Sequence, residues 1–573
     1  MDRTAWIVVS LCVIGLVVWQ IYVAKQMPPR PAPVHVAAGQ TSPSATPKVL
    51  EASPPPATPA ETPKGAEPSP SFAEKIETLK NSDVELHLTN RGGGIKEAVL
   101  LRQIAEKGQR VMLNSAPSAP IGAIIEQPSA PTLPEFTAST ESSSVVQFER
   151  TTDEQVVIRK KFSFEKSSEN KDNYVVDMEV DLENRGSRAY QSSGYFLALG
   201  SAAPIHPRDY PSYTRVVWCI DGRAKGIDVN WFGSSGGFLG LGQRAARPYY
   251  QENVAGAEWV AVSNQFFTTL MAPLTAKATG VWGRRFDVDY SPEQKLPAIE
   301  GALGMPGFQL QPGQTYSARF EIYAGPKIYH RLAQLPHNEA EVMDFGIFKL
   351  VCQFLLNFMN LLHSWLHDYG LAILALTTII KLTLWPIQNR ANRSMRQMGA
   401  LSPKMQELRD KYKDDPTRMN QELMKLYKQY GINPVGGCLP MMIQIPIFFG
   451  LFKMLGQAVE LRNAKFLWVK DLSQPDTIAH LPILGWPINI IPLCMAATQI
   501  WLMAMTPKTG DATQRRIMMF TPLIFLFICY NFAAALALYY TAQNLFSILQ
   551  FYQNKRQPMP TLEKVAPAAK RKR

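Results

Sequence analysis

The stretch YGLAILALTTIIKLTLWPI, residues 369–387, decides how this chain folds, because it is apolar over its whole length apart from one charge. At about 1.5 Å per residue, a helix of this length crosses the ~30 Å hydrocarbon layer of a membrane. The charge is Lys381, several residues before the basic Arg390 that follows the stretch. A charge near the centre of a span costs about 2.5 to 3.5 kcal/mol on insertion scales. We therefore predict a transmembrane helix whose lysine faces a polar cavity or a partner.

Three more apolar stretches follow, at residues 436–458, 481–503 and 517–552. The last is too long for one crossing at roughly 20 residues per span, so it predicts two short helices with a turn near Asn531 and Phe532. Together with the first stretch, these segments predict five transmembrane helices that form one core.

Near the N-terminus, the run from Ala5 to about Val23 is also long enough to span. A signal peptide cleaved after Ala24 would place bulky Tyr22 at the minus-three position, where a small residue is required. The sequence therefore favours an uncleaved anchor over residues 1–27, which brings the predicted total to six crossings.

Residues 350–366 are apolar enough to be mistaken for another span. Their polar residues recur at spacings of four, three and four, which places them on one helical face opposite the bulky apolar residues. We predict an amphipathic helix over residues 345–366 that lies in the membrane interface rather than crossing it. The polar residues are Gln353, Asn357, Asn360 and Ser364, and the apolar ones are Phe354, Leu355, Phe358, Leu362 and Trp365.

The distribution of charge predicts the orientation of the spans. Residues 388–431 carry ten Lys or Arg against five acids, residues 506–516 three against one, and residues 554–573 seven against one. Positively charged segments stay in the cytoplasm, so both termini are expected there. The large segment after the first span is then expected on the opposite side of the membrane from the two termini.

Between the anchor and the core lie a linker and a large soluble unit. Residues 28–72 are dominated by Pro, Ala, Ser and Thr, which cannot bury a core. Residues 73–344 show period-two alternation, clearest where Val176, Met178 and Val180 alternate with acids. This pattern predicts a large antiparallel β-sandwich.

The composition excludes several classes of function. The formal net charge of +12 lies beside the predicted spans, so it indicates membrane lipids rather than a specific nucleic acid. The six cysteines and eight histidines show no metal-ligand spacing. There is also no Gly-rich loop ending in Lys-Ser or Lys-Thr for nucleotide phosphates. We therefore expect no metal, no cofactor and no enzymatic activity.

The cytoplasmic segment 388–431 has its own helical pattern. Apolar residues recur at three and four in two runs, and Asp414-Asp415-Pro416 breaks the helix between them. This predicts an antiparallel helical hairpin, ended by Gly431 and Pro434. The basic hairpin is either a solvated loop or a docking arm for nascent chains or the ribosome, and the pattern does not separate these alternatives.

Lys381 has no acidic partner in any of the other predicted spans. Snorkelling to the headgroups is the alternative to a polar cavity, but about two helical turns separate the lysine from them. Polar residues on other spans could line a hydrated groove with it, although each is also a common hydrogen bonder in helix packing. These candidates are Thr377, Gln444, Gln499 and Asn544.

Several motifs resemble the YidC/Oxa/Alb family of membrane protein insertases, and in particular its Gram-negative type. The resemblance covers the whole architecture and is most specific in four motifs: Asn433 to Pro440 (NPVGGCLP), Gln444 to Phe448 (QIPIF), Glu460-Leu461-Arg462 with Trp468 and Asp471-Leu472-Ser473, and Leu538-Tyr539-Tyr540 with Asn544.

The resemblance implies an insertase that helps newly made membrane proteins enter the bilayer and fold, alone or with the Sec translocon. It implies a five-helix core over residues 367–553 around a hydrophilic groove open to cytoplasm and lipid. Lys381 replaces the family's usual arginine, which keeps the charge and loses the planar fork of donors. Thr377, Pro446, Tyr539 and Tyr540 match positions that would contact a substrate helix. The expected partners are nascent membrane proteins, the Sec translocon, lipids and the ribosome, the last through the hairpin and the basic tail 554–573.

Two other classes remain open. A transporter or channel would also place a charge in a span, but we find no convincing inverted repeat. A carbohydrate-binding or sugar-processing β domain would need a histidine placed beside an acid, and His206 and His330 are the candidates.

Overall fold

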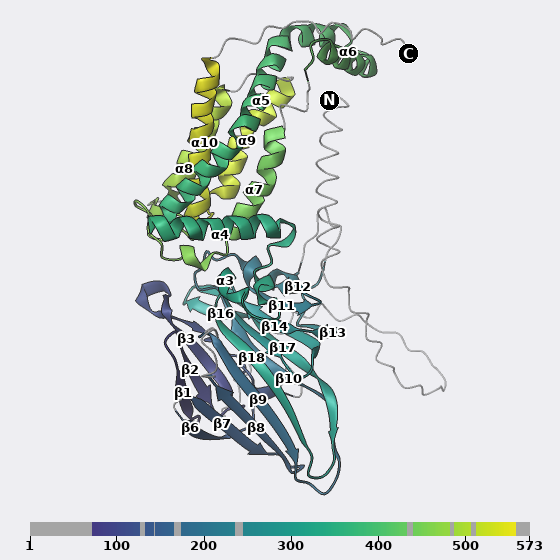
Figure 1. Ribbon diagram of the computed structural model, residues 1–573, viewed down its shortest axis with the longest axis vertical. Helices are drawn as coiled ribbons and strands as arrows, with labels where there is room; N and C mark the ends of the chain where they lie inside the picture. Colours follow the sequence, from purple (N-terminus) through teal and green to yellow (C-terminus); the bar gives the residue numbers. More distant parts are fainter. Residues whose placement is uncertain are drawn as a thin grey trace, which may run out of the picture.

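The computed structural model describes residues 72–125, 132–142, 144–164, 173–234, 244–432, 439–481, 486–505 and 512–556. The predicted anchor 1–27, nearly all of the linker 28–72 and most of the tail 554–573 lie outside these ranges. A β-rich domain and a bundle of helices are stacked along the long axis of the molecule (Figure 1). The same order was expected from the sequence.

In its described residues, the β-rich domain contains three antiparallel sheets. The first has the order β1-β2-β3-β4, the second β13-β16-β17-β10-β5, and the third β12-β11-β14-β15-β18-β9-β8-β7-β6. In chain order the strands are β1 (Ile76–Lys80), β2 (Val84–Thr89), β3 (Gly94–Ile104), β4 (Arg110–Leu113), β5 (Ile124–Ile125), β6 (Thr137–Ser142), β7 (Val145–Thr151), β8 (Val156–Ser163), β9 (Val175–Asn184), β10 (Tyr190–Ala202), β11 (Arg215–Ile220), β12 (Arg223–Asp228), β13 (Tyr250–Ala257), β14 (Trp259–Ser263), β15 (Phe267–Pro273), β16 (Ala278–Ser291), β17 (Gln294–Leu310) and β18 (Thr315–Pro326).

The predicted alternation is confirmed in strand β9, where Val176, Met178 and Val180 are buried and the acids between them are half-buried. Strand β9 pairs with β8 on one side and β18 on the other. These three apolar side chains of β9 therefore point to one face of the sheet, as period-two alternation requires.

Short helices and single turns lie between the strands and in the connection from β18 to the bundle. Helix α2 (Val229–Phe232) follows β12, and helix α3 (Tyr329–Leu332) follows β18. Single helical turns lie at η1 (Glu106–Gly108), η2 (Pro211–Tyr213), η3 (Glu339–Met343) and η4 (Gly346–Phe348). The chain then enters helix α4 (Lys349–Leu366), which lies across the end of the bundle (Figure 1).

Helix α4 has two apolar faces rather than the single one expected from the sequence. Leu355 and Leu362 are buried in the protein, whereas Phe354 and Trp365 are 64% and 73% exposed. The buried face packs against helix α7, where the Cys352 thiol donates to the Gly450 carbonyl oxygen. The exposed aromatic row is typical of a helix that lies in a membrane interface.

The remaining helices are α5 (Tyr369–Lys411), α6 (Pro416–Gln429), α7 (Leu439–Leu455), α8 (Ile490–Met505), α9 (Ala512–Cys529) and α10 (Ala534–Lys555). Helices α9 and α10 are separated at residues 530–533, where the sequence predicted a turn. Turn η6 (Val459–Leu461) follows α7, and strands β19 (Thr477–His480) and β20 (Pro487–Asn489) pair before α8.

Helix α8 begins at Ile490 rather than near residue 481 as predicted. The preceding residues pair as a short hairpin, and the Asp476 carboxylate accepts from the Ile491 backbone amide at 2.8 Å. This carboxylate satisfies an amide that the first turn of a helix otherwise leaves without a partner.

The predicted cytoplasmic hairpin forms, but its first arm is the continuation of α5 rather than a separate helix. Asp415 caps α6 by accepting from the Arg418 amide, which explains the break at Asp414-Asp415-Pro416. The arms share a small core of Leu401, Met405, Met419, Leu423, Tyr427 and Ile432.

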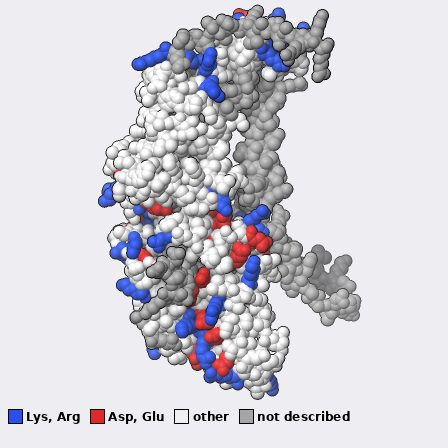
Figure 2. Space-filling model, viewed as in Figure 1, with Lys and Arg blue, Asp and Glu red and all other residues white. Residues whose placement is uncertain are grey.

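Two described helices, Gly346–Leu366 and Tyr369–Lys411, are long and apolar enough to cross a membrane by length and composition, and three shorter apolar helices accompany them. The count of six crossings stays a prediction. On the face drawn in Figure 2, the middle of the bundle carries almost no charged side chains, and basic residues gather beyond it at the hairpin end.

Candidate functional site

One face of helix α10 carries a continuous row of polar side chains. Tyr539, Gln543, Ser547, Gln550 and Asn554 recur at spacings of four, four, three and four. That spacing places them in line along one side of a helix. The side chains on this row bond to α7 near the first residues and to α5 near the last.

Lys381 from α5 meets this row at its centre. Its Nζ donates to the Ser547 hydroxyl oxygen at 2.9 Å, and that hydroxyl donates to the Gln543 carbonyl oxygen. Among the residues that the structure describes, no acid lies within ion-pair distance of Lys381. The amine, which carries up to three donors, is half-buried and partly satisfied by a neutral hydroxyl.

Gln444 from α7 joins the same row one turn away. Its Nε2 donates to the Tyr539 hydroxyl at 3.1 Å and to the Gln543 Oε1 at 2.9 Å. The predicted residues Lys381, Gln444 and Tyr539 thus meet one polar row, linked by Gln543 and Ser547. Polar groups buried in an apolar bundle are costly unless each has a hydrogen-bond partner. The contacts described above give Lys381, Gln444 and Gln543 such partners.

Two predicted groove residues face elsewhere. Asn544 is buried, and its Nδ2 donates to the Met495 carbonyl and the Thr498 hydroxyl of α8. Consecutive side chains of a helix lie about 100° apart around its axis, so Asn544 is on a different face from its neighbour Gln543. Gln499 is half-buried on α8 and is not part of this row.

The predicted substrate-contact residues differ in access. Thr377 and Tyr539 are each 1% exposed, and the Thr377 hydroxyl donates to the Ile373 carbonyl of its own helix. Tyr540 packs its ring against Phe448 and Phe525, and Pro446 lies half-buried inside α7. Tyr540 and Pro446 are therefore the more accessible pair in this conformation.

Amide side chains close the row at the end nearest the hairpin. Gln550 Nε2 donates to the Asn389 Oδ1 at 2.7 Å and to the Trp385 carbonyl, and Asn554 Nδ2 also donates to Asn389. Arg396 donates to the Asn554 carbonyl. These contacts fasten the base of the hairpin to the end of α10.

Sequence reasoning missed Gln543, Ser547, Gln550, Asn389 and Asn554. The polar spacing within residues 539–554 was a usable signal, because it is the same pattern that identified the polar face of residues 353–364. The partners on α5 and α7 could not be assigned without knowing which helices are neighbours.

The β domain does place a histidine beside an acid, but outside both of its described cavities. His206 Nε2 lies 2.9 Å from the Glu106 Oε1, and its Nδ1 accepts from the Arg208 amide. His330 is exposed on α3.

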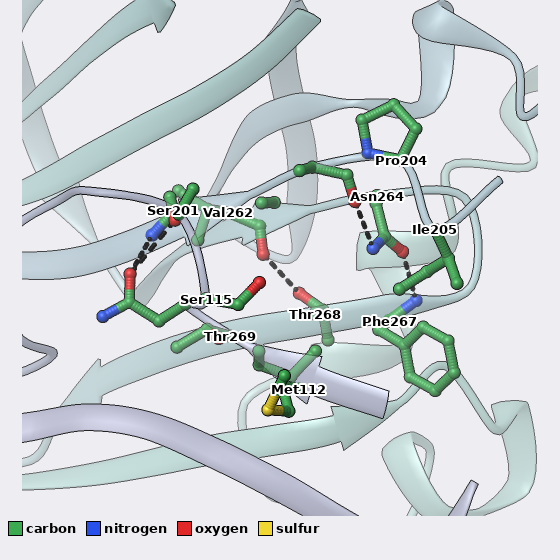
Figure 3. A pocket seen from close by; sticks show the side chains of 15 residues that line it. Met112, Ser115, Ser201, Pro204, Ile205, Val262, Asn264, Phe267, Thr268 and Thr269 are labelled. Atoms are coloured by element: carbon green, nitrogen blue, oxygen red, sulfur yellow. Dashed lines mark hydrogen bonds between the residues drawn. The ribbon is translucent and has the colours of Figure 1, made fainter. Parts of the chain in front are cut away.

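One cavity has a volume of about 50 Å³ between the sheets (Figure 3), where Asn264 accepts from the Phe267 amide. The other, of about 380 Å³, is lined by charged residues of β8, β9 and β18. Ligand pockets are typically about 300 to 1,000 Å³, and neither cavity is lined by a histidine.

A β-rich domain joined to an apolar bundle with one internal polar row defines a class of membrane proteins with a large domain outside the bilayer. A family model described as the YidC periplasmic domain matches residues 77–358, and one described as the 60Kd inner membrane protein matches residues 361–560. The chain belongs to the YidC family.

Curated relatives carry the name membrane protein insertase YidC. The protein of Syntrophobacter fumaroxidans is 39% identical over 302 residues, which cover 51% of this chain and 53% of that protein. The protein of Syntrophus aciditrophicus is 42% identical over 260 residues, covering 45% and 46%. That of Nitratidesulfovibrio vulgaris is 32% identical over 391 residues, covering 66% of each. The chain thus spans about half to two thirds of the length of these relatives.

A crystal structure of an active YidC insertase with its first transmembrane domain resolved covers 85% of this chain and 94% of that chain, at 18% identity and a TM-score of 0.34. A putative aldose 1-epimerase from Escherichia coli covers 44% of this chain and 99% of that chain, at 12% identity and a TM-score of 0.27.

Proposed function

We propose that this protein is a membrane protein insertase that moves the hydrophilic flank of a new membrane protein along the polar row of α10. The observation that carries the proposal is the contact of Lys381 with Ser547 on the polar row of the bundle. A half-buried cation held only by a hydroxyl is available to an incoming acidic or polar group. If Lys381 were paired with an acid of the protein itself, its charge would be less available to an incoming group.

The proposed orientation places the hairpin and both termini in the cytoplasm and the β domain in the periplasm of a bacterial inner membrane. Helix α4 then lies at the periplasmic interface with Phe354 and Trp365 in lipid. The polar row would form a hydrophilic groove open to cytoplasm and lipid within a core of five helices, with an N-terminal anchor as the sixth.

In the proposed mechanism, the substrate helix slides along the apolar surface near Pro446 and Tyr540 while its short flank follows the row. Moving a polar group from water directly into hydrocarbon costs roughly 4 to 8 kcal/mol. Polar side chains along the route replace part of that hydration, and the Lys381 ammonium attracts acids in the flank. Burial of the substrate helix in lipid then favours release without nucleotide hydrolysis.

The partners follow from the same arrangement. Nascent membrane proteins would reach the row from the cytoplasm, delivered by a ribosome held near the basic hairpin and tail. The Sec translocon would be a further partner for substrates with large external domains. Replacing the family's arginine by lysine keeps attraction to acids but removes bidentate recognition of a carboxylate.

The test is insertion of a small one-span protein into vesicles that contain only the purified protein. Lys381→Ala and Lys381→Glu should lower insertion of a substrate with an acidic flank, and Glu should do more damage because it repels that flank. Lys404→Ala is the matched control, since Lys404 contacts Tyr430 on the hairpin. Full insertion of every substrate by the Ala variant would refute the role of the charge.

A transporter remains the second class to exclude. The same vesicles should release no small solute when no substrate protein is present. Solute flux that requires Lys381 would replace the insertase proposal by a transport function.

A further inference from the structure

A tight turn between η6 and β19 presents two apolar side chains to the outside of the protein. The Phe466 amide donates to the Val469 carbonyl oxygen at 3.0 Å, and the Val469 amide donates to the Phe466 carbonyl oxygen at 2.8 Å. Leu467 and Trp468 lie between them and are 74% and 46% exposed. Residues 466–469, the apolar turn, therefore form a two-residue hairpin with an apolar tip.

Leu467 has an unfavourable backbone conformation. Its φ is +52°, in the left-handed region that disfavours residues with a Cβ atom. Glycine or asparagine is the residue favoured at the first central position of such a turn. The chain thus keeps a large apolar side chain at an exposed position where glycine would cost less free energy. Strain of this kind points to a function of the side chain rather than to packing.

The base of the apolar turn is fixed to the bundle. Val469 is buried, and the Phe466 ring lies so close to Gly370 that it leaves no room for a Cβ atom there. The Trp468 Nε1 donates at 3.2 Å to the Asp476 carboxylate, the same group that caps the start of α8. The exposed tip is therefore held in place before any partner binds, so little conformational entropy is lost on binding.

The apolar turn lies at the corner between α4 and α5. Gly370 is the second residue of α5, and the exposed side chains of Trp365 and Leu366 end α4 just before this corner. Helix α4 itself lies across the end of the bundle that faces the β domain (Figure 1). The contact of Phe466 with Gly370 therefore places the tip next to the exposed apolar row of α4.

Two lysines flank the apolar turn. Lys465 directly precedes it and Lys470 directly follows it, and both are exposed. Among the residues that the structure describes, neither lysine pairs with an acid. An apolar tip between two ammonium groups matches the interface of a bilayer, where phosphate groups lie above the acyl chains. Tryptophan is also enriched at that level of a membrane.

We propose that the apolar turn inserts Leu467 and Trp468 into the lipid interface beside α4. Lys465 and Lys470 then bind the phosphate groups of anionic phospholipids. The occupant is the bilayer itself, because the turn continues the exposed row of α4 and carries the charge that anionic headgroups attract. The turn thus forms a second lipid anchor at this end of the bundle, fixed to the starts of α5 and α8.

The test uses the full-length protein in vesicles whose acyl chains carry a nitroxide quencher. An environment-sensitive fluorescent amino acid replaces Leu467, Phe354 of α4 or Leu274 in turn. Leu274 is the matched control, since it is an exposed leucine of the β domain. Fluorescence at position 467 should be quenched about as strongly as at position 354, and roughly twofold or more above the quenching at position 274.

The charges are tested in the same vesicles. Lys465→Glu together with Lys470→Glu should lower the quenching at position 467 roughly twofold when phosphatidylglycerol is present, because its phosphates repel the new carboxylates. In phosphatidylcholine alone the quenching should stay unchanged. Lys225→Glu together with Lys295→Glu, on exposed lysines of the β domain, is the control and should have no effect in either lipid.

Leu467→Gly separates lipid contact from packing within the protein. Glycine adopts the left-handed conformation without strain, so the melting temperature of the variant should equal or exceed that of the wild-type protein. A lower melting temperature would show that Leu467 packs within the protein, and would contradict the proposal.

Quenching at position 467 no stronger than at position 274 would overturn the proposal and leave the apolar turn to water or to a protein partner. An unchanged signal in the Lys465→Glu, Lys470→Glu variant would refute the binding of lipid phosphates. No substrate protein is present in these measurements. Failure of the wild-type protein to insert any substrate would therefore refute only the proposed function.

Discussion

Lys160 in the β domain and Lys381 in the bundle are both removed from bulk water, and neither has an acid within ion-pair distance among the described residues. The surroundings of Lys160 are complete, since two carbonyl oxygens and an aromatic ring hold its amine. Lys381 has one hydroxyl and remains half-buried. The difference teaches that a buried charge marks a site when its contacts are incomplete, and marks structure when they are complete.

The largest expected effect concerns pH and Lys160. Burial lowers the pKa of this lysine from its ordinary 10.5 to about 7. Between pH 7 and 10.5 the unfolded chain binds a proton at this lysine that the folded protein does not. The free energy of unfolding therefore rises with pH across this range, and below pH 7 the full cost of the buried charge is present. Lys160→Met should abolish a rise on the order of a few kcal/mol, measured as unfolding free energy at pH 7 and pH 10. An identical pH slope in the variant would contradict complete burial of the amine.

A smaller effect is expected at Gln543 in the polar row. Gln543→Leu removes one of the two acceptors of the half-buried Gln444 amide, and an N–H left without a partner costs about 1 to 3 kcal/mol. Insertion should fall about tenfold for substrates with polar flanks, with little change for substrates whose flanks are apolar. Asn544→Leu provides the control because Asn544 faces α8, and an equal loss there would mean that helix packing rather than the row is responsible.

Ser547→Ala should have a still smaller effect. It removes the one hydroxyl that accepts from Lys381, a hydrogen bond worth about 0.5 to 1.5 kcal/mol. The freed amine is then more available, so crosslinking of Lys381 to an acidic flank should rise even if insertion slows two- to threefold. A large loss of insertion together with weaker crosslinking would show that Ser547 contacts the substrate itself.

The smallest effect is expected for Lys381→Arg. The charge is kept, and the longer planar guanidinium can still reach the Ser547 hydroxyl. Insertion rates should match the wild-type protein or exceed it slightly for acidic flanks, measured side by side in the same vesicles. A severe defect would mean that the shape of the Lys381 side chain matters as well as its charge.

Much of the fold was predictable, because local patterns determine it. Alternation in Val176, Met178 and Val180 predicted strand β9, and Asp415 with Pro416 predicted the hairpin break. The start of α8 was placed too early because the apolar residues before Ile490 pair as a hairpin, and hydropathy does not distinguish a strand from a helix over so few residues.

The candidate site was predictable only in part. Lys381 is conspicuous because its charge is costly anywhere in a span. Ser547 and Gln543 are ordinary polar residues whose importance depends on which helices are neighbours. Asn544 was predicted to line the groove because it has the same side-chain amide as Gln543. Its amide instead bonds to α8, whereas that of Gln543 bonds to α7.

Helix α5 is one continuous helix of 43 residues, about 65 Å long at 1.5 Å per residue. That is roughly twice the hydrocarbon thickness of a bilayer, so the helix is long enough to cross a membrane and extend well beyond it. Lys381 lies twelve residues after Tyr369, or about 18 Å along the axis. Its depth is therefore set by residue count, and inserting one residue between Tyr369 and Lys381 would shift the charge by ~1.5 Å and rotate it about 100° away from Ser547.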